Sequence, residues 1–271
     1  MRRRRLLWGL LAAAVLLVLL LILALDNRLV VRRYEIGTDK LTENIRIAVV
    51  SDLHSCAYGE NQRELLDAVA AETPDLVLLP GDIVDDVLPE GNAWTVLEAL
   101  AEKWPCCYVT GNHEWWSGEA ERICQDIEAL GIHVLRGECV DIAVKGQTLT
   151  VYGIDDPDSG EDQLPYLSPA AEEGYTILLA HRPERIGAYR QYPFDLVVSG
   201  HAHGGQWRIP GLLNGLYAPN QGLFPQYAGG CYDEDGMAFV VSRGLAREST
   251  RIPRLFNPPE LVVVDLVPEE S

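Results

Sequence analysis

Residues 45–54 read IRIAVVSDLH, an apolar run that stops at two side chains able to bind a metal ion, Asp52 and His54. The run is short and rich in β-branched residues, so it predicts a buried strand over residues 45–50. The same order, a short apolar run followed by a polar group, recurs four more times along the chain. This repetition decides the fold class.

Predicted strands and helices alternate in the first half of the chain, and strands dominate the second half. Helical spacing of apolar residues predicts helices over residues 61–72, 94–104 and 119–130. The remaining apolar runs predict strands over residues 75–79, 107–109, 133–135, 140–144, 149–154, 175–179, 196–198, 238–242 and 261–267. Alternation is typical of parallel βαβ units, and the strand-rich half predicts a second sheet, so we expect an α/β fold. Residues 26–44 read as a linker and the start of the domain.

The composition is that of an ordinary globular chain, with 48% hydrophobic and 23% charged residues among 271. This mix excludes a disordered, collagen-like or polytopic membrane chain, and the length allows one large domain. The net charge is −18, from 22 basic and 40 acidic residues. Residues 1–33 hold seven arginines and one aspartate, so the remainder carries 15 basic and 39 acidic residues, or −24. A body this acidic is a poor partner for nucleic acid.

An uncharged apolar run of twenty residues, 6–25, follows four arginines at positions 2–5. At the helical rise it spans about 30 Å, the thickness of a bilayer core. An uncleaved anchor is favoured over a cleaved signal peptide, whereas a loose twin-arginine export signal stays open. More positive charge precedes the run than follows it, which predicts an extracytoplasmic body on a single-pass protein of the cell membrane. The expected division is residues 1–33 for the anchor and linker and 34–271 for the domain.

The polar groups that follow the predicted strands are all of types that bind metals. They are Asp52 and His54, Asp82, Asn112 and His113, His181, and His201 and His203. Ligands gather at the carboxyl ends of strands in open α/β sheets, so we expect these side chains at one edge. In Asp-x-His and His-x-His, alternate residues of an extended chain face the same side and can reach one ion. Imidazole and carboxylate together suit Mn, Fe or Zn better than Ca or Mg.

Each of these motifs alone has an ordinary structural explanation, such as a turn or a helix cap. Together they predict a metal site, because five of the six histidines fall at strand ends and only His133 reads as a packing residue. Gly81, Gly111 and Gly200 precede ligands and would let the backbone turn sharply beside the metals. The six cysteines form no C-x-x-C pair and are expected to be buried free thiols.

The order Asp-x-His, Gly-Asp, Gly-Asn-His-Glu, His and Gly-His-x-His resembles that of the calcineurin-like metallophosphoesterase superfamily, over most of residues 45–267. The run His201-Ala-His-Gly-Gly-Gln206, with Ser242-Arg-Gly-Leu245 and Asn257-Pro-Pro-Glu260, is similar to a subgroup of membrane-anchored bacterial phosphoesterases. That subgroup includes cell-wall-associated phosphodiesterases and hydrolases of the pyrophosphate of a UDP-diacylglucosamine, and the motifs do not choose between them. The resemblance implies a four-layer αββα sandwich after the membrane helix, and two divalent ions, Mn or else Fe or Zn.

The resemblance also implies a role for each candidate residue. Asp52, His54 and His203 would hold one metal, Asn112, His181 and His201 would hold the other, and Asp82 would bridge both. His113 would face the substrate as an acid or a charge stabiliser, and a metal-bridging hydroxide would attack phosphorus in line with the leaving oxygen. Two divalent ions set against two carboxylates and a hydroxide leave a charge of about +1, which attracts an anionic phosphate.

Neighbouring residues are less specific signals. Arg182 directly follows a ligand and is either a phosphate contact or a surface or supporting arginine. Trp115 and Trp116 follow the Asn-His-Glu segment, and core packing of at least one is favoured over stacking on a base or contact with lipid. Trp115 is the candidate substrate contact of the two. The apolar segment 207–227 reads as a covered satellite core, with a substrate pocket or a bilayer contact as the alternatives.

Together these features predict a membrane-anchored dimetal phosphoesterase. A phosphodiesterase or pyrophosphohydrolase is favoured, acting on phosphodiester or pyrophosphate substrates that include lipid- or wall-linked ones. The alternatives are a phosphomonoesterase, including a protein phosphatase, and a metal-bearing surface protein that has lost catalysis. A dead site should have lost a ligand or His113, and none is missing. The sequence does not fix the oligomeric state.

Overall fold

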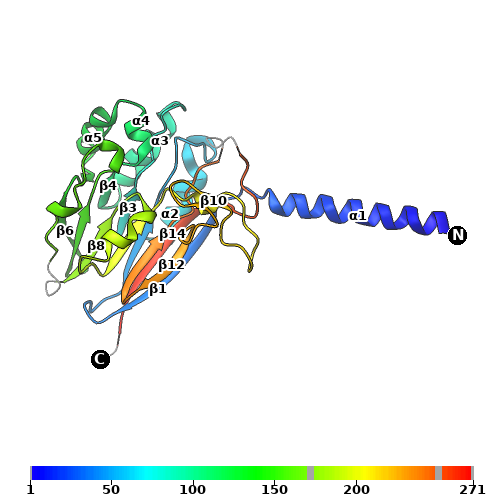
Figure 1. Cartoon of the computed structure of the whole chain (residues 1–271). Coiled ribbons are helices and arrows are strands. Elements are labelled where there is room, and N and C mark those ends of the chain that lie inside the picture. The colour runs from blue at the N-terminus through cyan, green and yellow to red at the C-terminus, as the bar shows by residue number, and fades with distance from the viewer. Residues whose placement is uncertain (1, 170–173, 248–251, 270–271) are drawn as a thin grey trace.

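Two six-stranded sheets face each other in the computed structural model, which describes residues 2–169, 174–247 and 252–269 (Figure 1). The strands of the first sheet are β1 (Val30–Thr38), β2 (Ile45–Val49), β3 (Leu76–Pro80), β4 (Cys106–Val109), β5 (His133–Val134) and β14 (Glu260–Pro268). They lie in the order β1-β14-β2-β3-β4-β5, and all pairs are parallel except β14 with β2.

The second sheet is built by the strand-rich half of the chain, as predicted. Its strands are β6 (Glu138–Val144), β7 (Gln147–Gly153), β8 (Tyr175–Leu179), β9 (Leu196–Ser199), β12 (Gly230–Glu234) and β13 (Met237–Val241). Their order is β12-β13-β9-β8-β7-β6, with parallel pairs in the middle and an antiparallel pair at each edge. A small hairpin of β10 (Tyr217–Ala218) and β11 (Gly222–Leu223) stands apart from both sheets.

The main core lies between the two sheets. Ile47 of β2, Ile177 of β8 and Val264 of β14 belong to this core and are fully buried. Neighbouring residues of the same strands point the other way, and Ala48 packs under the helices. Because both faces of these central strands are covered, their sequences are mostly apolar, and the charged exceptions Arg46 of β2 and Asp265 of β14 form an ion pair at 2.6 Å.

Helices cover the outer face of the first sheet. They are α2 (Arg63–Glu72), α3 (Gly91–Ala101) and α5 (Ala120–Ala129), whose apolar sides pack on β2, β3 and β4. The outer face of the second sheet has a thinner cover of single turns and the short helix α6 (Ile186–Tyr189), with Phe194 packed beside it. The order of layers is therefore helix, sheet, sheet, helix, and the predicted αββα class is confirmed.

Helix α1 (Arg2–Ala24) projects away from the body (Figure 1). Among the described residues it is the one helix long and apolar enough to cross a membrane, with a mean hydropathy of 3.1 and no part of that window buried. Its last residue, Ala24, is buried, and the Ala24 carbonyl accepts a hydrogen bond of 2.7 Å from the backbone N–H of Phe256. The body therefore holds the end of the helix directly.

Four of the sequence predictions that the structure contradicts concern edge strands. Strand β1 begins at Val30, inside the segment predicted to be a linker. Cys139 on β6 and Cys231 on β12 are exposed, unlike the four other cysteines, which are buried as predicted. His133 on β5 is exposed and does not pack in the core. An edge strand has a more open surface than a central one, so its polar and apolar residues do not follow the pattern of a fully buried run.

Candidate metal centre

The candidate site lies where the carboxyl ends of five strands meet. Asp52 follows β2, Asp82 follows β3, Asn112 follows β4, His181 follows β8, and His201 follows β9. Each of these side chains is buried. The parallel central strands of both sheets deliver them to one edge, as expected for ligands in open α/β sheets.

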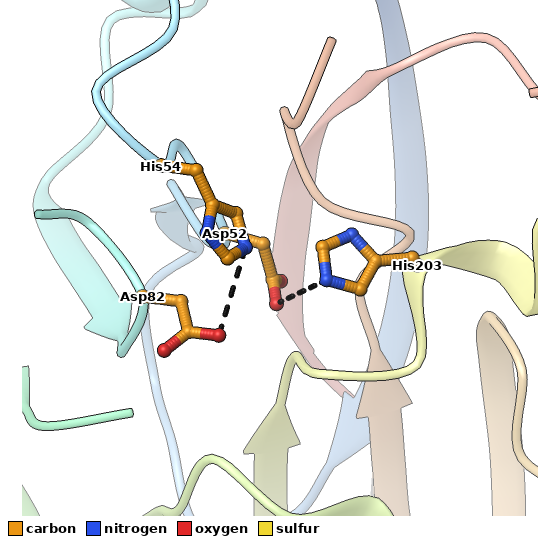
Figure 2. A group of neighbouring side chains, drawn as sticks. All are labelled: Asp52, His54, Asp82 and His203. Atoms are coloured by element: carbon orange, nitrogen blue, oxygen red, sulfur yellow. Dashed lines mark ion pairs between the residues drawn. The ribbon is translucent and has the colours of Figure 1, made fainter. Parts of the chain in front are cut away.

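Two groups of possible metal ligands share one residue, Asp82. In the first group the ligand atoms of Asp52, His54, Asp82 and His203 lie within 4.8 Å of one another, and in the second those of Asp82, His181 and His201 do. Figure 2 shows the first group converging, with His54 facing Asp82 at 3.6 Å and His203 facing Asp52 at 3.9 Å. His181 Nε2 lies 3.1 Å from the same Asp82 oxygen, Oδ2.

The donor atoms of this site suit divalent cations. Three buried lone-pair donors, His54 Nε2, Asp82 Oδ2 and Asn112 Oδ1, find no hydrogen-bond partner among the residues that the structure describes. Burial raises the pKa of the Asp52 carboxyl, so its charged form needs positive charge nearby. His181 Nε2 and His201 Nδ1 face each other at 3.2 Å, an arrangement that requires a proton or a cation between the rings. The residues present therefore fit a pair of divalent ions.

The backbone of the site differs from the predicted extended geometry. Asp52, His54, Asp82, His201 and His203 have φ values of 49°, 48°, 53°, 63° and 47°, all in the left-handed region. Asp52 and His54 belong to one ligand group, as predicted, whereas His201 and His203 belong to different groups, and left-handed turns carry both pairs. Such conformations cost of the order of 1–3 kcal/mol each and are found at functional sites, where surrounding contacts hold them.

Close backbone packing explains why glycines precede and surround the ligands. A Cβ on Gly111 would overlap the Asp82 carboxylate, and a Cβ on Gly200 would overlap Asp52 and Ser51. Gly244, in the segment Ser242–Leu245, lies against Asp52, and a Cβ there would come 2.6 Å from the Asp52 Cβ. The later motif of the sequence thus forms part of the wall behind the ligands.

Glu114 fixes the turn that carries Asp82, a role that the sequence analysis missed. Its buried carboxylate accepts four backbone N–H groups, at 3.0 Å from Asp82, 2.7 Å from Ile83, 3.0 Å from Val84 and 2.8 Å from Gly111. The signal was available, because a glutamate three residues after the residue that precedes a helix is the spacing of a capping box. Here the helix is α4 (Asn112–Trp116).

Two adjacent aspartates orient two histidines, and the sequence analysis missed both. Asp85 accepts a hydrogen bond from His54 Nδ1 at 3.0 Å, which leaves His54 Nε2 free for a metal. Asp86 lies 2.7 Å from His113 Nδ1. Burial lowers the pKa of His113, but Asp85, Asp82 and Asp86 outweigh burial and raise it to about 9. His113 lies outside the two groups that share Asp82, but with His54 and Asp85 it forms a third group whose possible ligand atoms lie within 4.8 Å of one another.

A cavity of about 440 Å³ opens onto both ligand groups. Asp82, Asn112, His201 and His203 contribute to its wall, and so does His113. Residues that line this cavity can touch a substrate bound in it.

Arg182 lines this cavity and is buried. Its guanidinium makes two hydrogen bonds to Asp156, at 2.5 and 2.8 Å, and Nη1 lies 2.8 Å from Asn220 Oδ1. Of the alternatives for Arg182, a surface position is wrong. The hydrogen bonds to Asp156 hold the guanidinium in one orientation at the cavity wall.

Of the two adjacent tryptophans, Trp116 and not Trp115 lines the cavity. Trp115 is not among the described residues that line the cavity, and its Nε1 donates to Thr110 Oγ1 at 2.8 Å. Trp116 does line the cavity, is 58% exposed, and packs on the His113 ring at 4.8 Å between centroids. The structure therefore does not support Trp115 as the substrate contact, because Trp116 is the tryptophan of this pair that lines the cavity.

The segment 207–227 is not the covered satellite core that the sequence favoured. Leu212 is 82% exposed, and Leu223 and Phe224 are each 66% exposed. Among the described residues this segment presents a large apolar surface to its surroundings.

Comparisons with known proteins agree with this geometry. The family model described as calcineurin-like phosphoesterase matches residues 45–205. An uncharacterised metallophosphoesterase of Aquifex aeolicus is 32% identical, with 88% of this chain and 92% of the relative covered. The phosphodiesterase YaeI of Escherichia coli is 30% identical, with 82% of each chain covered. A 5'-nucleotidase precursor from Thermus thermophilus has a similar fold, with a TM-score of 0.53 and 13% identity over 76% of this chain and 50% of that one.

Proposed function

Because the chain belongs to the calcineurin-like phosphoesterase family, and is therefore a metal-dependent phosphoester hydrolase, we propose that it is a membrane-anchored hydrolase of phosphodiesters or pyrophosphates. The observation that carries the proposal is the sharing of Asp82 between two ligand groups on one cavity, with His113 on the same wall. A site with two cations and a separate proton donor suits an ester whose leaving oxygen is a poor one.

The proposed ligands follow the two groups. Asp52, His54 and His203 would hold one ion, Asn112, His181 and His201 the other, and Asp82 both. Divalent ions bound there would activate water and neutralise the charge of the phosphate. Manganese is proposed first, with iron or zinc as alternatives, because the donors are imidazoles, carboxylates and an amide.

Residues of the chain would then orient the substrate and donate a proton to its leaving oxygen. His113, oriented through Nδ1 by Asp86, would donate a proton from Nε2 to the leaving oxygen. Arg182, held by Asp156, would bind a non-bridging phosphate oxygen. Trp116 would cover the group attached to the phosphate.

A second substituent on the phosphate has room in this cavity. Its wall includes Pro219 and Ile252 as well as Trp116, all apolar, beyond the residues proposed as ligands. This supports a diester or pyrophosphate over a monoester, whose phosphate carries a single organic group. The named activity of the YaeI relative, a phosphodiesterase, supports the same choice.

A comparison of four conditions tests the proposed reaction. The full-length protein is assayed on bis-(p-nitrophenyl) phosphate and on p-nitrophenyl phosphate, each with manganese and after chelation. We expect metal-dependent hydrolysis with the diester preferred. A preference for the monoester would favour the phosphomonoesterase alternative, and no hydrolysis of either under any metal would favour a protein that has lost catalysis.

We also propose that α1 spans the cell membrane with the body outside the cytoplasm. The four arginines before the apolar run, against three after it that are offset by Asp26, support this orientation. Protease added to intact cells should digest the body and spare a cytoplasmic control protein. Protection in intact cells, with cleavage in inverted vesicles, would mean that the body faces the cytoplasm.

A further inference from the structure

Seven exposed apolar side chains gather on loops next to the candidate site, and we call them the apolar collar. They are Trp207, Ile209, Leu212, Tyr217, Leu223, Phe224 and Ile252, with exposed fractions between 40% and 82%. In the part of the body that the structure describes, only Val87, Trp116 and Tyr166 join them as exposed large apolar side chains. Apolar surface concentrated in this way marks a binding surface.

The collar lacks the negative charge of the rest of the body. Segment 207–227 contains one charged residue, Arg208, and no acidic residue, although the chain after residue 33 carries a net charge of −24. A surface that is apolar and free of acids suits contact with lipid, whereas the acidic remainder of the body does not.

Backbone hydrogen bonds connect the collar to the end of α1. The Phe256 N–H donates to the Ala24 carbonyl at 2.7 Å, and the neighbouring residue, Leu255, accepts from the Arg208 N–H at 2.9 Å. The Trp207 indole N–H donates to the Pro253 carbonyl at 3.0 Å. Figure 1 shows the loop that carries β10 beside the inner end of α1, on the same side of the body.

We propose that the apolar collar rests in the interfacial layer of the same bilayer that α1 spans. This inference rests on the proposed membrane span. The structure favours a lipid surface as the partner of the collar. Hydrogen bonds through Leu255 and Phe256 join the base of the collar to Ala24, where the span ends, so a bilayer around α1 lies next to the collar. Trp207 and Tyr217 are also of the two residue types that concentrate at membrane–water interfaces.

Docking of the collar would fix the position of the cavity relative to the membrane. Ile252 belongs to both the collar and the cavity wall, and Gln206 of the wall directly precedes Trp207. The His203 carbonyl and the Gln206 carbonyl both accept from the Asn257 amide, at 2.7 and 3.2 Å, so the metal-site turn and the base of the collar move as one unit. The mouth of the cavity would therefore open at the lipid surface.

Quenching of fluorescence by brominated lipid tests this proposal without any measurement of activity. The full-length protein, with Cys139 and Cys231 replaced by serine, receives one cysteine by Leu212→Cys or Phe224→Cys, which is labelled with bimane. Each variant is reconstituted in phosphatidylcholine and phosphatidylglycerol vesicles whose acyl chains carry bromine. We expect the bimane emission at both positions to shift to the blue and to lose intensity relative to vesicles without bromine.

Two labelled controls distinguish failure of collar docking from failure of membrane insertion. Bimane on Leu16→Cys in α1 should be quenched, which reports that the span is inserted. Bimane on Cys139 of β6, in a chain where only Cys231 is replaced by serine, should not be quenched, because β6 is an edge strand far from α1 in Figure 1. Unquenched label at Leu212 and Phe224, with quenched label at Leu16, would overturn the docking proposal and leave the anchor intact. An unquenched Leu16 label would instead refute the anchor on which the proposal rests.

A charged variant separates lipid contact from contact between copies of the chain. Leu212→Glu with Phe224→Glu should abolish quenching of a bimane placed by Ile209→Cys, because two carboxylates oppose entry into an anionic interface. Hydrolysis of a water-soluble diester should be unchanged, which reports a folded body. Cross-linking of two copies through Ile209→Cys, without quenching by lipid, would assign the collar to a dimer and overturn the proposal.

Discussion

At the scale of single residues, Asp82 is the one residue that belongs to both ligand groups that surround it. Its Oδ2 faces His54 and His181, and its Oδ1 accepts from the His113 backbone N–H at 2.9 Å. We expect Asp82→Ala to lose both metal ions and all metal-stimulated hydrolysis, whereas Asp67→Ala on the surface of α2 should lose neither. Elemental analysis of the purified variants gives the metal content. Two ions per chain in Asp82→Ala would contradict the shared-ligand assignment.

Asp85 and Asp86 offer a matched pair of adjacent carboxylates whose nearest histidines differ, although Asp85 also lies 3.4 Å from His113 Nδ1. Asp85 orients His54, a proposed ligand, while Asp86 orients His113, which is not one. Asp85→Asn should weaken metal affinity about 10–100-fold, the usual effect of removing a partner of a metal-binding histidine. Asp86→Asn should leave metal affinity unchanged and lower kcat, more strongly for substrates with poor leaving groups than for nitrophenyl esters.

Metal titration and kinetics on the same preparations check this pair. The assignment predicts opposite patterns, one variant altered in metal binding and the other in kcat at saturating metal. Equal loss of metal affinity in both variants would place His113 among the ligands, and we would then reassign its role.

At the scale of elements, the turn after β3 and the start of α4 are held together by one side chain. Glu114 accepts four backbone N–H groups from the two segments. Glu114→Ala would leave those buried donors unpaired, at a cost of roughly 1–3 kcal/mol for each unsatisfied group that water does not reach. We expect a clear fall in Tm and loss of metal. The control Glu128→Gln on the exposed side of α5 should change neither, and an unaltered Tm for Glu114→Ala would refute this structural role.

Central elements could be predicted from the sequence, and edge elements could not. Strands such as β3 and β8 are covered on both faces, so burial leaves an uninterrupted apolar run that is easy to read. In β1 the run is broken by Arg32, Arg33 and Glu35, because the strand lies at the edge of its sheet and pairs only with β14. The pairing partner is far along the chain, and local patterns carry no information about it.

A similar limit applies to the candidate site. The proposed ligands were identifiable because each follows an apolar strand and belongs to a residue type that binds metals. Glu114, Asp85 and Asn220 act through hydrogen bonds to ligands or to backbone, and an acidic or amide residue in a turn has too many other uses to be assigned without coordinates. Trp115 and Trp116 are adjacent, so only the orientation of α4 decides which of them reaches the cavity.

At the scale of the whole molecule, the body begins before residue 34. Residues Val30–Thr38 pair with β14 along nine positions, and Arg33 Nη2 lies 2.6 Å from Oε1 of the buried Glu72. A chain that starts at residue 27 should therefore be soluble, stable and active. Removal of residues 1–33 cuts four residues from β1 and leaves Glu72 without this partner, so the Tm should fall by roughly 2–4 °C for each kcal/mol lost. Thermal denaturation of the two truncated chains decides this, and equal Tm values would show that the start of β1 contributes nothing.

Five residues, 25–29, separate the end of α1 from the start of β1, and fully extended they reach about 18 Å at most. If α1 lies in a membrane, a body joined to it by so short a segment, and hydrogen-bonded to its last residue, stays in a thin layer directly above the lipid. Its encounters with substrates in that membrane take place in two dimensions. The quantity that governs turnover is then the number of substrate molecules per unit area, and dilution of the surrounding fluid leaves it unchanged.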